Sequence, residues 1–195
     1  MANRNTTGFG LIAQGTVGST PATQGQGKYL IDAGYNQDLF QGCTVKSKAG
    51  YIVEASSTRT FLSIGVFNGI FYNDATTKKP TFANFYNQPI TPANSEDITA
   101  FVIDNPNQLF VGAIDASAAQ SQYGRTYGLT VTAAGSDLSG QSSSTLTYAT
   151  RHDTNNQWRL VRSAEDPENN EDAAFRSVVV AHNLNQYFTG AVTWQ

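Results

Sequence analysis

The amino-acid sequence predicts a mainly β fold, a single β-barrel or sandwich-like domain with an extended N-terminal arm and long loops. From Lys28 onward, short runs of β-branched and aromatic residues alternate with Gly, Asn, Asp, Ser and Pro, which is typical of all-β domains. No run has the apolar spacing of a long amphipathic helix. A chain of 195 residues is long enough for one domain with a substantial core. We therefore expect an arm at 1–27 and a β-rich globular domain at 28–195.

The arm is small and polar except for one apolar island, which contains Phe9, Leu11 and Ile12. Such a segment buries too little surface to order itself. Two interpretations stay open: a frayed terminus, or an arm that docks on a neighbouring subunit and there buries the three side chains. On the second interpretation Phe9, Leu11 and Ile12 are candidate interface residues.

The globular part contains ten predicted strands. Ile98–Ile103 and Val178–Ala181 are apolar nearly throughout, so we expect them at the centre, covered on both faces. The Ser- and Ala-rich stretch that follows Asp115 leaves room for one short helix near Ala116–Gln120, with Asp115 as its N-cap. The predicted strands are Lys28–Asp32, Thr44–Lys46, Tyr51–Ala55, Phe61–Tyr72, Ile98–Asp104, Leu109–Ile114, Tyr127–Ala133, Thr145–Arg151, Trp158–Ser163 and Ser177–His182.

Composition excludes several classes of protein. Only 14% of the residues are charged, the net charge is −3, and the basic residues are scattered, which argues against nucleic acid as a partner. Cys43 is the only cysteine, so we expect a small buried residue rather than a disulfide. No apolar run approaches the roughly 18 residues of a membrane span, and the first residues lack the apolar core of a signal peptide. We expect no membrane partner and synthesis in the cytoplasm.

The sequence offers little for catalysis or for a cofactor. The only histidines are His152 and His182, there is no Gly-x-Ser-x-Gly motif, and metal-ligand spacing is missing. We expect a protein that is not an enzyme and that holds no cofactor. The acidic run Glu165–Asp172 has enough oxygens for calcium but lacks the alternating spacing of an EF-hand loop, so a solvated loop is the simpler interpretation.

Aromatic residues gather between Phe67 and Tyr86. Phe67 and Phe71 have the same parity on a predicted strand, so we expect both in the core. Four others lie on or beside a Pro-rich excursion at 73–97 that carries little charge, a composition typical of the core of a protein–protein interface. The candidate interface residues here are Tyr72, Phe82, Phe85 and Tyr86.

Four segments carry a family resemblance: Gly65–Tyr72, Lys79–Phe82, Ile98–Pro106 and Trp158–Arg162. They resemble small structural proteins of tailed phages of marine and freshwater bacteria (cyanophage- and pelagiphage-like), which are similar in role to capsid decoration or cement proteins. The resemblance covers most of the chain from Phe9. It implies a β-rich homotrimer on the exterior of the virion that ties neighbouring major capsid proteins together.

Two rival functions stay open beside this resemblance. A tail or fibre adhesin would bind host glycans, with Trp158 and Trp194 as stacking residues. A glycosidase of β architecture would take its carboxylates from Glu165, Asp166 and Glu168, although nothing in their spacing selects a pair.

Overall fold

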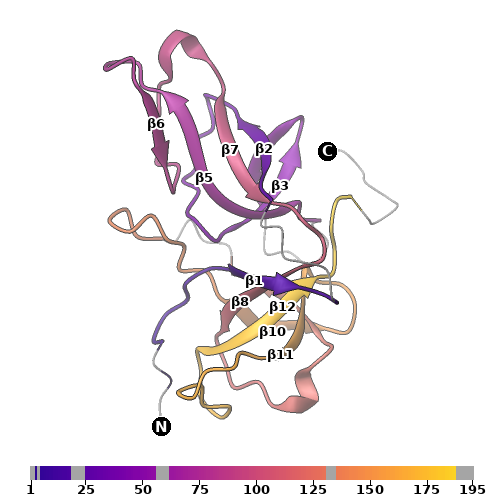
Figure 1. Ribbon diagram of the computed structural model, residues 1–195. Coiled ribbons are helices and arrows are strands. Elements are labelled where there is room, and N and C mark those ends of the chain that lie inside the picture. Colours follow the sequence, from indigo (N-terminus) through magenta and orange to yellow (C-terminus); the bar gives the residue numbers. More distant parts are fainter. Residues whose placement is uncertain (1–2, 4, 19–24, 56–61, 131–134, 188–195) are drawn as a thin grey trace.

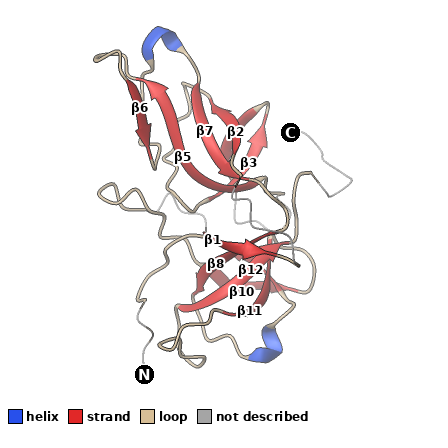
Figure 2. Ribbon diagram, in the orientation of Figure 1, coloured by secondary structure: helices blue, strands red, loops and turns tan. Residues whose placement is uncertain are grey.

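The chain forms two stacked β layers, one above the other in Figures 1 and 2. The computed structural model describes residues 3, 5–18, 25–55, 62–130 and 135–187. Within these ranges there are twelve strands and two single-turn 3-10 helices, η1 (Ala93–Ser95) and η2 (Gln120–Gln122). No helix in these ranges is long and apolar enough to cross a membrane. The prediction of a mainly β fold is confirmed.

The lower layer is a closed five-stranded barrel in the order β8-β10-β9-β11-β12, and β12 pairs with β8 to close it. The β8–β10 pairing is parallel and the other barrel pairings are antiparallel. Strand β1 (Ile12–Thr16) pairs with β8 outside the ring. The barrel strands are β8 (Gln108–Ile114), β9 (Thr126–Leu129), β10 (Leu146–His152), β11 (Trp158–Ser163) and β12 (Arg176–His182).

The upper layer is a second sheet in the order β2-β7-β5-β3-β4, with β6 also paired to β5. All of its pairings are antiparallel. Its strands are β2 (Gly27–Ile31), β3 (Thr44–Lys48), β4 (Tyr51–Glu54), β5 (Gly65–Asn73), β6 (Pro80–Ala83) and β7 (Ile98–Ile103).

Each layer has its own apolar core, and the two cores meet. Phe110, Tyr127 and Trp158 are fully buried in the barrel cluster, which also includes Val66 and Ile103 from the second sheet. The other cluster, around Phe67 and Ile70, fills the second sheet. Cys43 is buried in this second cluster, as predicted, and its burial raises the pKa of its thiol. The barrel core is therefore completed by side chains from the upper layer.

The described part of the arm packs against this chain's own barrel. Leu11 is 3% exposed and belongs to the barrel core, and its backbone N–H donates to Gly42 O at 2.9 Å. At Gly112 of β8 a Cβ would lie 2.8 Å from Leu11 Cδ2, so the missing side chain makes room for Leu11. Leu11 therefore needs no neighbouring subunit to bury it, and the interpretation of a frayed terminus is wrong for the paired residues of β1.

Each predicted strand overlaps an observed strand, but the strand predicted at Phe61–Tyr72 begins only at Gly65. Strands β1 and β6 were not predicted. The expected helix at Ala116–Gln120 is wrong: only the 3-10 turn η2 follows, and Asp115 Oδ1 accepts a hydrogen bond from Tyr148 N at 2.7 Å instead of capping a helix. Predicted strand residues 61 and 131–133 lie outside the described residues.

The expectation of two fully buried strands holds for one of them. Strand β12 is buried from Arg176 to Val180. Strand β7 instead alternates, because Ile98, Ala100 and Val102 face the core whereas Thr99 and Phe101 are half-exposed. The outward side of β7 is part of the candidate site.

Candidate protein interface

A β-bulge in β5 turns an aromatic side chain outward. Phe67 pairs with Val102 of β7, but Gly69 pairs with Phe101, so one extra residue lies between the two pairs. Because a bulge shifts the alternation of side chains by one residue, Ile70 is fully buried and Phe71 is 39% exposed. The prediction that Phe71 shares the core with Phe67 is wrong for this reason.

Three neighbouring strands continue this apolar surface. Phe71 pairs with Phe82 of β6, and the Phe82 ring lies 5.8 Å from that of Phe101 on β7. Leu30 of β2 pairs with Thr99 of β7, and Thr99 lies two residues from Phe101 on the same face of the sheet. The exposed fractions are 65% for Phe82 and 42% for Leu30. We call Leu30, Phe71, Phe82 and Phe101 the outer sheet face.

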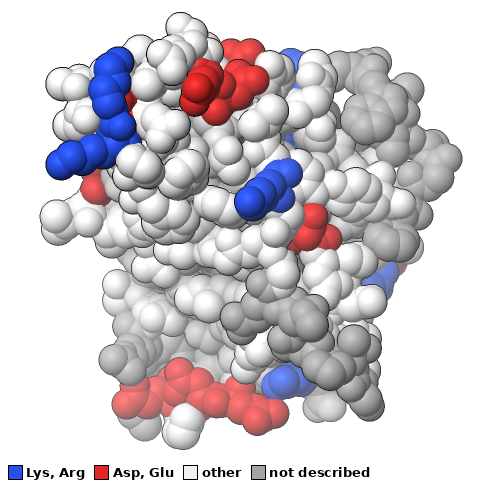
Figure 3. Space-filling model, turned by 45° about the horizontal axis from the view of Figure 1, so that its top comes forward, with Lys and Arg blue, Asp and Glu red and all other residues white. Residues whose placement is uncertain are grey.

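Few charges surround these side chains. Lys28 pairs with Phe101 and is exposed. On the side of the molecule drawn in Figure 3, most of the surface belongs to uncharged residues. Exposed aromatic residues that cluster on a sheet with little charge have the composition of an interface core. The outer sheet face is therefore a surface suited to binding another protein.

The seven interface residues predicted from the sequence divide into three groups. Phe82 lies on the outer sheet face, and Ile12, 49% exposed, lies on β1 instead. Leu11 and Tyr86 are buried within this chain, so neither is available to a partner; Tyr86 is fully buried and its hydroxyl donates to Tyr35 O at 2.7 Å. The remaining three, Phe9, Tyr72 and Phe85, are half-buried.

Phe85 has an internal partner. Its ring stacks on Phe40 with centroids 5.8 Å apart and an interplanar angle of 6°. The side-chain amide of the adjacent Asn84 donates to Ser139 O at 2.7 Å, which joins the 73–97 excursion to a loop of the barrel. Phe85 therefore packs within this chain, next to the Asn84 contact that joins the two layers.

Sequence reasoning missed three members of the outer sheet face: Leu30, Phe71 and Phe101. Leu30 and Phe101 alternate with buried neighbours on β2 and β7, which is a weak signal in the sequence. No signal for Phe71 was available, because its orientation depends on the bulge.

Neither histidine is placed for nucleophilic catalysis. The imidazole of His182 lies 4.2 Å from the Trp158 ring and 5.9 Å from that of Phe110, between centroids, and burial lowers its pKa to about 3. Both of its nitrogens are buried without a hydrogen-bond partner among the described residues. His152 Nδ1 accepts a hydrogen bond from Thr154 N at 3.2 Å. Within the part of the chain that the structure describes, neither ring hydrogen-bonds to a serine or cysteine, and a neutral His182 acts as a core residue.

The acidic run at 165–172 is held by arginines and amides. Glu165 pairs with Arg162 at 3.1 Å, and Glu171 pairs at 2.7 Å with Arg176, which is fully buried. Within the described ranges no three acidic, His or Cys side chains gather as metal ligands would. Two carboxylates of this acidic run thus have guanidinium partners.

Of the two tryptophans predicted to stack on glycans, Trp158 is not displayed for that role. Trp158 is fully buried, and its Nε1 donates to Thr44 Oγ1 at 3.1 Å. It is therefore a core residue that joins the barrel to the second sheet. Trp194 lies outside the described residues.

Comparison of the chain with protein-family models, with curated proteins and with solved structures finds no match.

Proposed function

We propose that this protein is a non-enzymatic capsid decoration or cement protein. It binds the outer surface of a phage head, contacts the major capsid protein, and stabilises the contacts between neighbouring copies of that protein. The outer sheet face carries the proposal, because it displays Phe71 and Phe82 where no side chain of this chain covers them fully. The resemblance of the four sequence segments supports a major capsid protein as the partner.

Multivalent binding explains how such a small surface can act. Four apolar side chains give a modest affinity for one copy, since association also costs translational and rotational freedom. When identical sites repeat on a preassembled shell and the protein is a homotrimer, the second and third contacts are intramolecular. Weak contacts at the outer sheet face then stabilise the shell together.

The test is association of the purified protein with itself and with purified capsids. Analytical ultracentrifugation gives the oligomeric state, and co-sedimentation gives capsid binding. Because truncation of a central interface aromatic costs about 2 kcal/mol or more, Phe71→Ser and Phe82→Ser should each weaken one of these associations by roughly tenfold or more.

Leu138→Ser is the matched control, since Leu138 is 99% exposed and lies outside the outer sheet face. The control should behave as the wild type. A wild-type protein that is monomeric at high concentration and does not sediment with capsids would contradict the proposal.

A tail or fibre adhesin remains the second candidate. Buried Trp158 no longer supports it, but a polar pocket lined by residues at 5–9 and 135–143 does.

A further inference from the structure

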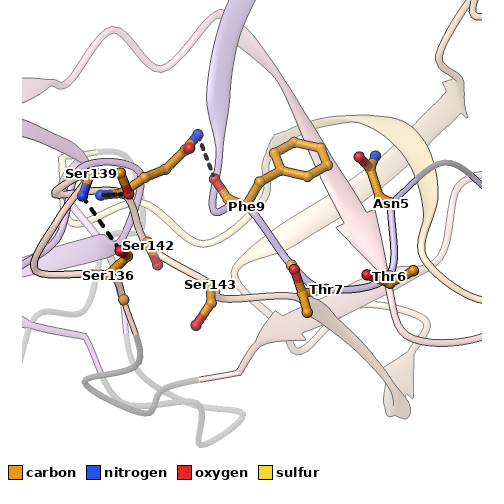
Figure 4. A pocket seen from close by; sticks show the side chains of 11 residues that line it. Asn5, Thr6, Thr7, Phe9, Ser136, Ser139, Ser142 and Ser143 are labelled. Carbon is orange, nitrogen blue, oxygen red and sulfur yellow. Dashed lines mark hydrogen bonds between the residues drawn. The ribbon is translucent and has the colours of Figure 1, made fainter.

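A pocket of about 460 Å³ lies between the N-terminal segment at 5–9 and the loop at 135–143 (Figure 4). Its volume is within the range of roughly 300–1,000 Å³ found for small-molecule sites. It shares no residue with the outer sheet face, so the proposed function does not account for it. Its lining is Asn5, Thr6, Thr7, Gly8, Phe9, Gly135, Ser136, Ser139, Gln141, Ser142 and Ser143.

The two walls of the pocket are held together by backbone contact and by hydrogen bonds. At Gly8 a Cβ would lie 2.2 Å from Ser143 O, so only glycine lets the two backbones approach this closely. Gln141 Nε2 donates to Phe9 O at 3.4 Å, and Asn5 Nδ2 donates to Ser177 Oγ of the barrel at 3.3 Å. The pocket is therefore formed before any ligand binds.

The lining is polar and carries no formal charge. Apart from two glycines and Phe9, it consists of hydroxyl and amide side chains. The hydroxyls of Thr6, Thr7 and Ser143 have no hydrogen-bond partner within the described ranges. Thr6 and Thr7 are also exposed, so three hydroxyl groups are available to a ligand.

We infer that this pocket binds a neutral saccharide. An anionic ligand would call for Arg or Lys in the lining, and a lipid would call for an apolar lining. Ring hydroxyls of a sugar both donate and accept hydrogen bonds, as Thr and Ser hydroxyls do. Phe9 is the aromatic residue of this lining, and aromatic rings offer an apolar surface to the C–H face of a sugar ring. A small uncharged glycoside satisfies both kinds of group.

The test uses the full chain and saturation-transfer NMR with the methyl glycosides of glucose, galactose, mannose and N-acetylglucosamine. Glucuronate and N-acetylneuraminate serve as charged comparisons. We expect at least one neutral glycoside to bind with a Kd of about 1–10 mM, and more tightly than either acid. No binding of any neutral glycoside at about 50 mM, or tighter binding of an acid, would overturn the inference.

Substitutions then place the bound sugar. Thr7→Val and Phe9→Leu should each weaken binding by roughly three- to tenfold, because each removes one contact. Thr7→Ser keeps the hydroxyl and should retain wild-type binding, and since Thr7 is exposed neither variant threatens the fold. Equal binding by Thr7→Val, Phe9→Leu and wild type would show that the sugar binds elsewhere.

Capsid co-sedimentation of the same variants separates this inference from the proposed function. Thr7→Val leaves the outer sheet face intact, so it should sediment with capsids as the wild type does.

Discussion

At the scale of single residues, His182 shows how burial changes the behaviour of a group that sequence reasoning treats as reactive. Both ring nitrogens are inaccessible even though part of the residue surface is not, and the rings of Trp158 and Phe110 pack beside the imidazole. Protonation would place a charge there without a partner, which is costly. The imidazole is therefore kept neutral by the barrel core.

This burial predicts a specific loss of stability in acid. The pKa of His182 falls from 6.5 to about 3 in the folded protein, so between these values the unfolded chain binds a proton that the folded chain does not. The free energy of unfolding should decrease as the pH falls from 6.5 toward 3, by at most about 1.4 kcal/mol per pH unit. Urea denaturation between pH 5 and 8 measures this slope.

The variant His182→Phe isolates the effect from other groups. Glu54 acts in the opposite direction, because burial raises its pKa to about 7. Its contribution to the free energy of unfolding is therefore greatest at low pH and is lost as the pH rises through 7. The difference in unfolding free energy between wild type and His182→Phe removes Glu54 from the comparison. A difference that does not change with pH would show that His182 takes up its proton within the fold.

At the scale of elements, strand β5 decides which side chains face outward. Near its N-terminal end, Val66 pairs with Thr44 of β3. Near its C-terminal end, Phe71 pairs with Phe82 of β6. The bulge between these two ends reverses the alternation of side chains. Without it, Phe71 would point inward with Phe67 and the outer sheet face would lose an aromatic ring.

Gly69 permits this bulge, and its substitution should be costly. Its φ is +147°, and a Cβ would lie 2.8 Å from Ala83 O of β6. Gly69→Ala should therefore lower the free energy of unfolding by about 1–3 kcal/mol. Gly15→Ala is the matched control, because Gly15 also lies at a strand irregularity but has open space around its Cα, and it should change stability little. Urea denaturation at neutral pH compares them, and equal losses would mean that β6 moves freely to accept the methyl group.

The difference between local and non-local information explains which elements the sequence predicts. Short runs of β-branched and aromatic residues predict strands such as β11, whose bounds agree with the prediction. Strand β1 was missed because Ala13, Gln14 and Gly15 have little β propensity, and its pairing with β8 comes from residues nearly a hundred positions away. The pairing of β12 with β8 and the bulge in β5 likewise depend on contacts between residues far apart in the sequence. The outer sheet face could therefore be predicted only through Phe82.

At the scale of the whole molecule, the two layers share one stabilising region. The barrel core contains Val66 and Ile103 from the second sheet together with Leu11 from the N-terminal segment. Trp158 of the barrel donates to Thr44 of the second sheet. Because removal of either layer would expose apolar side chains of the other, we expect the layers to unfold together.

Leu11 tests this coupling, since it enters the barrel core from the N-terminal segment. A chain lacking residues 1–20 should be destabilised, because β1 and a buried leucine are lost. Leu11→Ala removes only the side chain and should cost about 2–5 kcal/mol. Ile12→Ala, at a 49% exposed neighbour, should cost much less.

Native-state hydrogen exchange distinguishes local from global loss in the Leu11→Ala variant. If the layers form one cooperative unit, the slowest amides of β12 in the barrel and of β7 in the second sheet should lose protection by the same free energy, because both exchange through global unfolding. Protection lost from β12 alone would mean that the barrel opens independently. The second sheet, with its outer face, would then remain folded, and the capsid binding proposed for that face should survive the loss of the barrel.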